Sequence, residues 1–166
     1  MTVTATYSSP LGPLLLAAES DTLTGLWLSG QEYFAAGLDP AAEEGDAPVL
    51  RAAAAWLGAY FSGEKPEIAG LSLAPKGSGF QKLVWSLLTE IPYGETTTYG
   101  ALAAEAEGQL GRRTSARAVG AAVGRNPISI ILPCHRVLGA SGSLTGYAGG
   151  LEKKAWLLRH EGAMMF

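Results

Sequence analysis

The chain is poor in the side chains that most often build metal sites and covalent cross-links. Its 166 residues include one cysteine, Cys134, and two histidines, His135 and His160. A single cysteine excludes an internal disulfide and any zinc site that needs several cysteines. Two histidines also argue against a metal site made from the usual histidine and cysteine ligands. We therefore expect neither a metal nor a cofactor.

Long apolar runs are also missing. No stretch approaches the roughly 18 consecutive apolar residues of a transmembrane helix, so we expect no membrane span. The first residues show neither a basic region nor a long apolar core, so we expect no signal peptide and a cytoplasmic protein. Hydrophobic residues make up 48% of the chain and charged residues 16%, which predicts a compact globular protein.

Charge is distributed unevenly along the chain. Residues 1–75 carry two basic and nine acidic side chains, a net charge of −7. Residues 76–166 carry ten basic and six acidic side chains, a net charge of +4. The overall charge of −3 argues against non-specific binding of nucleic acid by the chain as a whole. The C-terminal part could nevertheless meet a polyanion while the N-terminal part faces away.

The N-terminal part has the pattern of strands followed by a helix. Short alternating segments within residues 3–28, separated by turn signals, predict a small antiparallel meander. Residues 30–46 are acidic and contain glycine and proline, which is typical of a solvated loop. A helix is predicted over Pro48–Phe61, with Asp46 as its N-cap. Residues 66–75 are interpreted as a linker that could include a short strand at 71–73.

Residues 78–166 are predicted to be mostly helical. Apolar periodicity and capping residues indicate helices over 78–91, from 98 to about 106, over 116–123 and over 151–161. The second and third are joined by a loop that contains Gly108 and lie beside arginines, which suggests a helix-turn-helix-like unit. Helix pairs of this kind are also common in proteins that never touch DNA.

The stretch around Cys134 is the main candidate for chemistry. An apolar run over 128–132 is interpreted as a strand that ends at Pro133. A strand that ends in this way can present a cysteine nucleophile at a pocket wall. The alternative is that Cys134 is a buried small hydrophobic residue, because free cysteine is among the most buried residue types.

Further blocks of sequence help to decide whether Cys134 is a nucleophile or a buried structural residue. The blocks are Ile91-Pro-Tyr-Gly-Glu, Thr98-Tyr-Gly-Ala-Leu-Ala, Ala116-Arg-Ala-Val-Gly, Asn126-Pro, Gly146-Tyr-Ala-Gly-Gly-Leu and Trp156-Leu-Leu-Arg-His-Glu-Gly. Together with Ile131-Leu-Pro-Cys-His-Arg-Val, they resemble the O6-alkylguanine-DNA alkyltransferases, also called methylated-DNA–protein-cysteine methyltransferases. The resemblance covers Phe80 to Gly162, and the N-terminal 75 residues are less diagnostic.

The resemblance implies an α+β fold with two domains. A small ribonuclease-H-like α/β domain would occupy residues 1–75. A mostly helical catalytic and DNA-binding domain with a helix-turn-helix-like unit would occupy residues 76–166. The implied activity is an SN2 transfer of the alkyl group from O6-alkylguanine to Cys134, with O4-alkylthymine as a second candidate substrate. Each molecule would react once, because a thioether does not hydrolyse readily. The protein would act as a monomer bound to the minor groove of double-stranded DNA.

The resemblance also implies roles around the cysteine. A free cysteine, with a pKa of about 8.5, is only slightly ionised at pH 7 and needs a base. His135 would take the proton through a bridging water, since neighbouring side chains in an extended segment point to opposite faces. Glu161 would orient His135. A glutamate at a helix C-terminus opposes the macrodipole, so some partner is expected there. Asn126 would tether the preceding helix, besides its ordinary turn role before a proline.

The target atom is inside duplex DNA, so the base must be flipped out of the stack. By resemblance Arg117 would fill the gap, while Tyr99 would crowd the target phosphate and donate to guanine N3. Small residues beside Arg117 would let the helix enter the minor groove, although such residues also allow close helix packing. The implied base pocket comprises Tyr99, Tyr147, Ala148, Val137 and Val123. The implied DNA contacts are Arg117, Tyr99, Gly100, Ala116, Ala118 and Ala140.

The sequence departs from the family pattern at two places. Ala148 stands where some members have a serine whose hydroxyl can contact O6, which could alter affinity for free-base inhibitors. Residues 109–112 lengthen the connection between the two helices relative to shorter members.

Other hypotheses are a damage-binding protein, a DNA-binding regulator and a cysteine hydrolase. The presence of Cys134, the acidic N-terminal half and the lack of a recognisable cleft weigh against them respectively.

Overall fold

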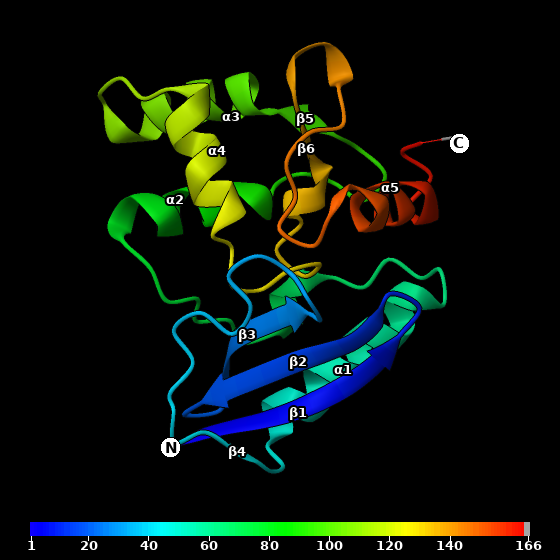
Figure 1. Cartoon of the computed structure of the whole chain (residues 1–166). Helices are drawn as coiled ribbons and strands as arrows, with labels where there is room; N and C mark the ends of the chain where they lie inside the picture. The colour runs from blue at the N-terminus through cyan, green and yellow to red at the C-terminus, as the bar shows by residue number, and fades with distance from the viewer. Residues whose placement is uncertain (165–166) are drawn as a thin grey trace. The chain divides into compact units, whose positions relative to one another are not determined.

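The computed structural model describes residues 1–164 and divides into two compact units (Figure 1). Unit 1 comprises Met1–Lys76 together with Pro127–Ile131. Unit 2 comprises Gly77–Asn126 and the chain from Leu132 onward. The chain therefore returns to unit 1 for five residues immediately before the segment that carries Cys134.

Unit 1 is built on an antiparallel meander with a helix on one face of its sheet (Figure 1). The strands are β1 (Thr2–Ser9), β2 (Gly12–Glu19) and β3 (Thr22–Leu28), in sheet order β3-β2-β1-β4. This confirms the predicted meander. The acidic loop also contributes β4 (Glu43–Glu44), which pairs in parallel with β1 and was not expected. Helix α1 spans Pro48–Phe61, as predicted, and a 3₁₀ turn spans Ile68–Gly70.

Helix α1 begins differently from the prediction. Its N-cap residue is Ala47, which has no side chain to cap with, so the assignment of Asp46 as N-cap is wrong. Asp46 instead pairs with Arg51. Asp21, in the turn between β2 and β3, accepts a hydrogen bond from the Val49 amide at 3.0 Å. A cap from a residue far away in sequence satisfies the same orphan amide, and local patterns cannot reveal it.

The apolar run over 128–132 does not form a strand. The Leu26 amide donates to the Pro127 carbonyl at 2.8 Å, and the Ser129 amide donates to the Leu26 carbonyl at 3.0 Å. These bonds make one isolated parallel bridge between Ile128 and β3. Ile130 then adopts a positive φ of 70°, which ends any extended pairing. The prediction of a strand is therefore wrong, although the apolar side chains are buried as expected.

Unit 2 contains four helices among the described residues. They are α2 (Gly79–Leu88), α3 (Tyr99–Leu110), α4 (Ala116–Gly124) and α5 (Leu151–His160). The N-cap residues of α2, α3 and α4 are Ser78, Thr98 and Ser115, respectively. Helix α3 continues four residues beyond the predicted end at Ala106 and includes Gly108. Gly111, at φ 68°, ends it, so the connection to α4 is shorter than predicted.

Packing in unit 2 joins the helices around buried apolar side chains. The central ones are Val84, Trp85, Leu102, Val119 and Leu157, none of which is more than 2% exposed. The Trp85 indole N–H also donates to the Ala122 carbonyl at 2.8 Å, which ties α2 to α4. A buried indole satisfied in this way fixes the spacing of the two helices as well as filling the core. None of the described helices is long and apolar enough to cross a membrane.

Candidate active site

A short parallel ladder places two of the predicted site residues in one region of unit 2. Strand β5 (Thr97–Thr98) pairs with β6 (Val137–Leu138). Tyr99 follows β5 directly as the first residue of α3, and Cys134 lies three residues before β6. The ladder therefore brings the start of α3 to the cysteine segment. Burial raises the pKa of Tyr99, and the nearby Cys134 raises it further, which is consistent with this arrangement.

Cys134 lies at the start of a 3₁₀ turn, Cys134–Arg136, and not in an extended segment. Pro133, at φ −81° and ψ 64°, bends the chain, and the Arg136 amide donates back to the Pro133 carbonyl at 3.0 Å. The expectation of an extended backbone here is wrong because the turn closes immediately after the proline. The Cys134 residue is only 5% exposed.

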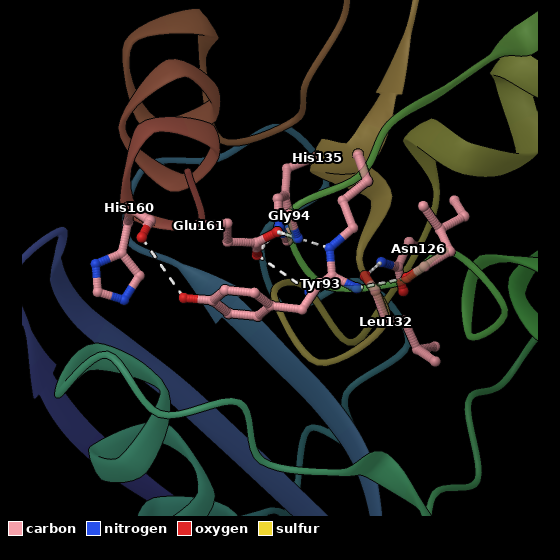
Figure 2. A network of polar contacts seen from close by, with 9 residues as sticks. Tyr93, Gly94, Asn126, Leu132, His135, His160 and Glu161 are labelled. Atoms are coloured by element: carbon pink, nitrogen blue, oxygen red, sulfur yellow. Dashed lines mark hydrogen bonds and ion pairs between the residues drawn. The ribbon is translucent and has the colours of Figure 1, made fainter. Parts of the chain in front are cut away.

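The thiol of Cys134 is held in its neutral form at rest. Burial raises its pKa, and this effect outweighs a hydrogen bond from the Asn126 side chain and the nearby charge of Lys154, which lower it. The Asn126 amide group also donates to the Leu132 carbonyl at 2.8 Å (Figure 2). Asn126 thus links the end of α4 to the residues just before the cysteine. A thiol in this state needs a base before it can act as a nucleophile.

His135 and Glu161 form a buried pair (Figure 2). The Nε2 atom of His135 lies 2.6 Å from Oε2 of Glu161, and neither side chain has any solvent exposure. Burial by itself would raise the pKa of Glu161, but the hydrogen bonds and charges of His135 and Arg136 outweigh it. The pKa of Glu161 therefore lies far below its usual range, and the group is a carboxylate.

The state of Glu161 determines the tautomer of His135. A carboxylate only accepts hydrogen bonds, so Nε2 must carry the proton that joins the pair. Burial lowers the pKa of His135, so the imidazole is neutral and Nδ1 has a free lone pair. Nδ1 is buried and hydrogen-bonds to no protein group among the described residues. This atom has the properties of a general base that acts on a neighbouring thiol.

Two charged residues of this region were not predicted as site residues from the sequence. Arg136 donates through Nε and Nη2 to the two oxygens of Glu161, at 2.8 and 3.1 Å. Lys154 is fully buried and donates to the carbonyls of Val137, Thr145 and Gly146, at 2.6, 2.7 and 3.0 Å. Burial lowers the pKa of Lys154 to about 8.

A sequence signal for both residues exists. Lys154 precedes Leu157 and Leu158 by three and four positions, which places it on the buried face of the last helix. Arg136 lies between the apolar run over 128–132 and the apolar pair Val137 and Leu138, which predicts burial, and a buried charge requires a partner. The partners themselves come from elsewhere in the sequence, so the pattern predicts burial but not the contacts.

Tyr99 is held against the same loop as Lys154. Its hydroxyl donates to the carbonyls of Thr145 and Gly146, at 3.4 and 3.3 Å. The Lys154 ammonium lies 5.8 Å from the centre of the Tyr99 ring, within the range of a cation–π contact. The loop that begins at Thr145 is therefore fixed from α3 and from α5, close to Cys134.

Comparison with protein families identifies this arrangement. The family model described as "6-O-methylguanine DNA methyltransferase, DNA binding domain" matches residues 79–163. The model described as "6-O-methylguanine DNA methyltransferase, ribonuclease-like domain" matches residues 2–75. The chain belongs to the 6-O-methylguanine DNA methyltransferase family. The predicted α+β fold, with a ribonuclease-like part followed by a DNA-binding part, is confirmed.

Relatives of this methyltransferase family match nearly the whole chain. The methylated-DNA–protein-cysteine methyltransferase of Methanosarcina acetivorans is 45% identical, over 96% of this chain and 97% of the relative. The Mycobacterium leprae protein of the same name is 47% identical, over 92% and 88%. The crystal structure of Mycobacterium tuberculosis OGT in complex with DNA is 43% identical, with a TM-score of 0.80 over 98% of this chain and 92% of that chain.

The residues of the predicted methyltransferase site differ in their solvent exposure. Cys134, His135, Glu161, Asn126, Val123 and Val137 are buried, whereas Tyr99, Tyr147 and Ala148 are half-buried. Gly100, Ala116, Arg117, Ala118 and Ala140 are exposed. The buried set lies between the end of α4 and β6 and at the end of α5, and the exposed set lies on α3, α4 and the turn after β6. The functional roles of all these residues stay predictions.

Proposed function

We propose that this protein repairs O6-alkylguanine in double-stranded DNA by transferring the alkyl group to Sγ of Cys134. The observation that carries the proposal is the buried His135–Glu161 pair, whose neutral imidazole belongs to the residue that follows the protonated Cys134 in the same turn. The names of relatives at 45–47% identity support the same chemistry. The reaction occurs once per molecule, because the thioether product is stable.

The proton path starts at the thiol. Nδ1 of His135 accepts the proton from Cys134 through a water molecule, and Glu161 stabilises the imidazolium that forms. The positive charge of Lys154 favours the thiolate. Sγ then bonds to the alkyl carbon while the bond from that carbon to O6 breaks. The electron pair stays on the guanine, which takes up the proton that left the thiol and now lies on the imidazolium, so neutral guanine, a neutral thioether and a neutral imidazole remain.

The exposed residues of unit 2 contact the DNA in this proposal. The target guanine leaves the stack and enters a pocket walled by Tyr99, Tyr147, Ala148, Val123 and Val137. On α4, the small exposed residues Ala116 and Ala118 allow entry into the minor groove, and Arg117 fills the gap. Gly100 and Ala140 approach the DNA backbone. We also propose that the protein acts as a monomer, that it is cytoplasmic and that it accepts O4-alkylthymine as a substrate.

The decisive experiment is a mass measurement. The protein is incubated with an equimolar duplex that contains one O6-methylguanine, digested and analysed for the modified peptide. One methyl group should appear on Cys134, and Cys134→Ala should gain none. A protein that remains unmodified at stoichiometric substrate would overturn the proposal. Tight binding to the lesion without a mass change would indicate a damage-binding protein instead.

The DNA-binding part of the proposal has its own test. Arg117→Ala should slow transfer from duplex DNA by a factor of about 10 or more while transfer from free O6-benzylguanine is retained, since only duplex DNA requires flipping. Arg112→Ala removes the same charge from an exposed position nearby and serves as the matched control. Equal losses in the two variants would contradict a specific role for Arg117.

A further inference from the structure

Arg136 is a buried cation that the proposed transfer leaves without a role. Its Nη1 donates to the Ile91 carbonyl at 2.7 Å, while Nε and Nη2 engage both oxygens of Glu161. Its guanidinium lies 5.7 Å from the centre of the Tyr93 ring. Three of its nitrogens are thus committed, and the side chain is 8% exposed. Such a fork cannot swing away from Glu161 without breaking a buried ion pair.

The turn over residues 91–94 supports both members of this pair. The Gly94 amide donates to Oε1 of Glu161 at 3.4 Å, and the Tyr93 hydroxyl donates to the His160 carbonyl at 3.5 Å (Figure 2). Gly94 has a φ of 81°, and a Cβ there would come within 3.1 Å of the Glu161 carbonyl oxygen. Only glycine fits this close approach without strain. The turn therefore holds the end of α5 and the guanidinium in one fixed geometry.

We propose that Arg136 is a positioning residue that keeps Glu161 ionised and so keeps the proton of His135 on Nε2, with Nδ1 free to serve Cys134. This inference rests on the proposed function. A carboxylate with two oxygens engaged by a guanidinium can only accept from Nε2. If Glu161 were protonated, it could donate to Nε2, the imidazole would carry its proton on Nδ1, and that atom could no longer accept one.

Arg136 also sets how readily the imidazole becomes charged. The charged groups that act on His135 are Glu161 at the end of α5, Arg136 in the same turn and Lys154 on α5. Cys134 precedes His135 in the chain, and Tyr93 in the turn over 91–94 faces Arg136 and Glu161. Glu161 favours the imidazolium, while Arg136 and Lys154 oppose it. Without the Arg136 charge, the His135–Glu161 pair takes up an additional proton at higher pH, and Nδ1 then carries a proton whether the second proton lies on Nε2 or on Glu161. The imidazole is therefore unavailable as a base over a wider pH range.

The experiment compares Arg136→Gln with Arg136→Lys in single-turnover transfer across pH. For Arg136→Gln, the acidic limb of the rate profile should move up by about one pH unit, the size of effect that one nearby charge has. Arg136→Lys keeps the charge but loses the fork, so its limb should stay in place while its maximal rate falls. Arg159→Gln removes an exposed charge from α5 and should leave the profile unchanged. If Arg136→Gln reduced the rate by the same factor at every pH, without moving the acidic limb, the inference would be overturned.

A second measurement reports the tautomer without reference to activity. The chain has only two histidines, so ¹⁵N-histidine labelling, with His160→Gln for assignment, isolates the His135 resonances. In the wild type, Nδ1 should show the shift of an unprotonated nitrogen and Nε2 that of a protonated one. Arg136→Lys should retain this pattern, and Arg136→Gln should lose it. If Arg136→Gln does not fold, a protonated Nδ1 in the wild type or in Arg136→Lys overturns the inference. Failure of the wild type to transfer a methyl group would instead overturn the proposed function.

Discussion

Glu161→Gln is the substitution that tests the buried site most directly. The carboxylate accepts from His135 at 2.6 Å, from Arg136 at 2.8 and 3.1 Å, and from Gly94 at 3.4 Å. Glutamine has almost the same shape but offers one acceptor oxygen and no charge. Its amide group must therefore point a donor at another donor, and the Arg136 guanidinium remains buried without a counter-ion.

The cost follows from these contacts. Removal of one partner from a buried ion pair destabilises a protein by about 3–5 kcal/mol, because the remaining charge is left uncompensated. For a chain of this length, such a loss lowers the melting temperature by roughly 6–20 °C. The transfer rate should fall by about 10²–10⁴, the contribution typical of a positioned general base, because the His135 imidazolium loses its partner.

The assay is urea unfolding at pH 7, together with single-turnover transfer at a temperature where both proteins are folded. Glu152→Gln, an exposed carboxylate in the first turn of α5, is the matched control and should change stability by about 0.5 kcal/mol or less. An unfolding free energy for Glu161→Gln within about 1 kcal/mol of the wild type would refute the assignment of Glu161 as the counter-ion of Arg136.

Three further predictions concern a helix cap, a buried lysine and the product state. Asp21→Ala should lower the unfolding free energy by about 1 kcal/mol through loss of the cap on α1; Asp39→Ala, whose bond is exposed, should change it less in the same urea titration. The pKa of Lys154 is lowered from 10.5 to about 8, so between these values the unfolded chain binds more protons and stability rises with pH. The free energy of unfolding of the wild type relative to Lys154→Met should therefore increase over that window, whereas a difference that does not change with pH would contradict the burial of a charged lysine. Alkylation of Cys134 adds bulk to a packed site, so the alkylated protein should melt at a lower temperature by calorimetry, and an unchanged melting temperature would argue against tight packing there.

Local patterns predicted most of the secondary structure correctly. The meander and α1 follow from alternation, turn residues and apolar periodicity, all of which act over a few neighbours. Two of the failures share one cause. Asp21 caps α1 from a distant turn, and the run over 128–132 bridges to Leu26 for a single residue before Ile130 turns away. In both cases the partner is far away in sequence, so no local signal could identify it.

The sequence by itself determined which chemistry is available. One cysteine beside a histidine, with a glutamate just before the glycine that follows the last helix, predicts a thiol nucleophile served by one base. The tertiary structure alone decided how those groups are charged. Burial keeps the Cys134 thiol and the His135 imidazole neutral, while the hydrogen bonds and charges of His135 and Arg136 together keep Glu161 ionised against its own burial. Solvation and hydrogen bonding depend on groups that converge from four stretches of the chain, and this convergence exists only after folding.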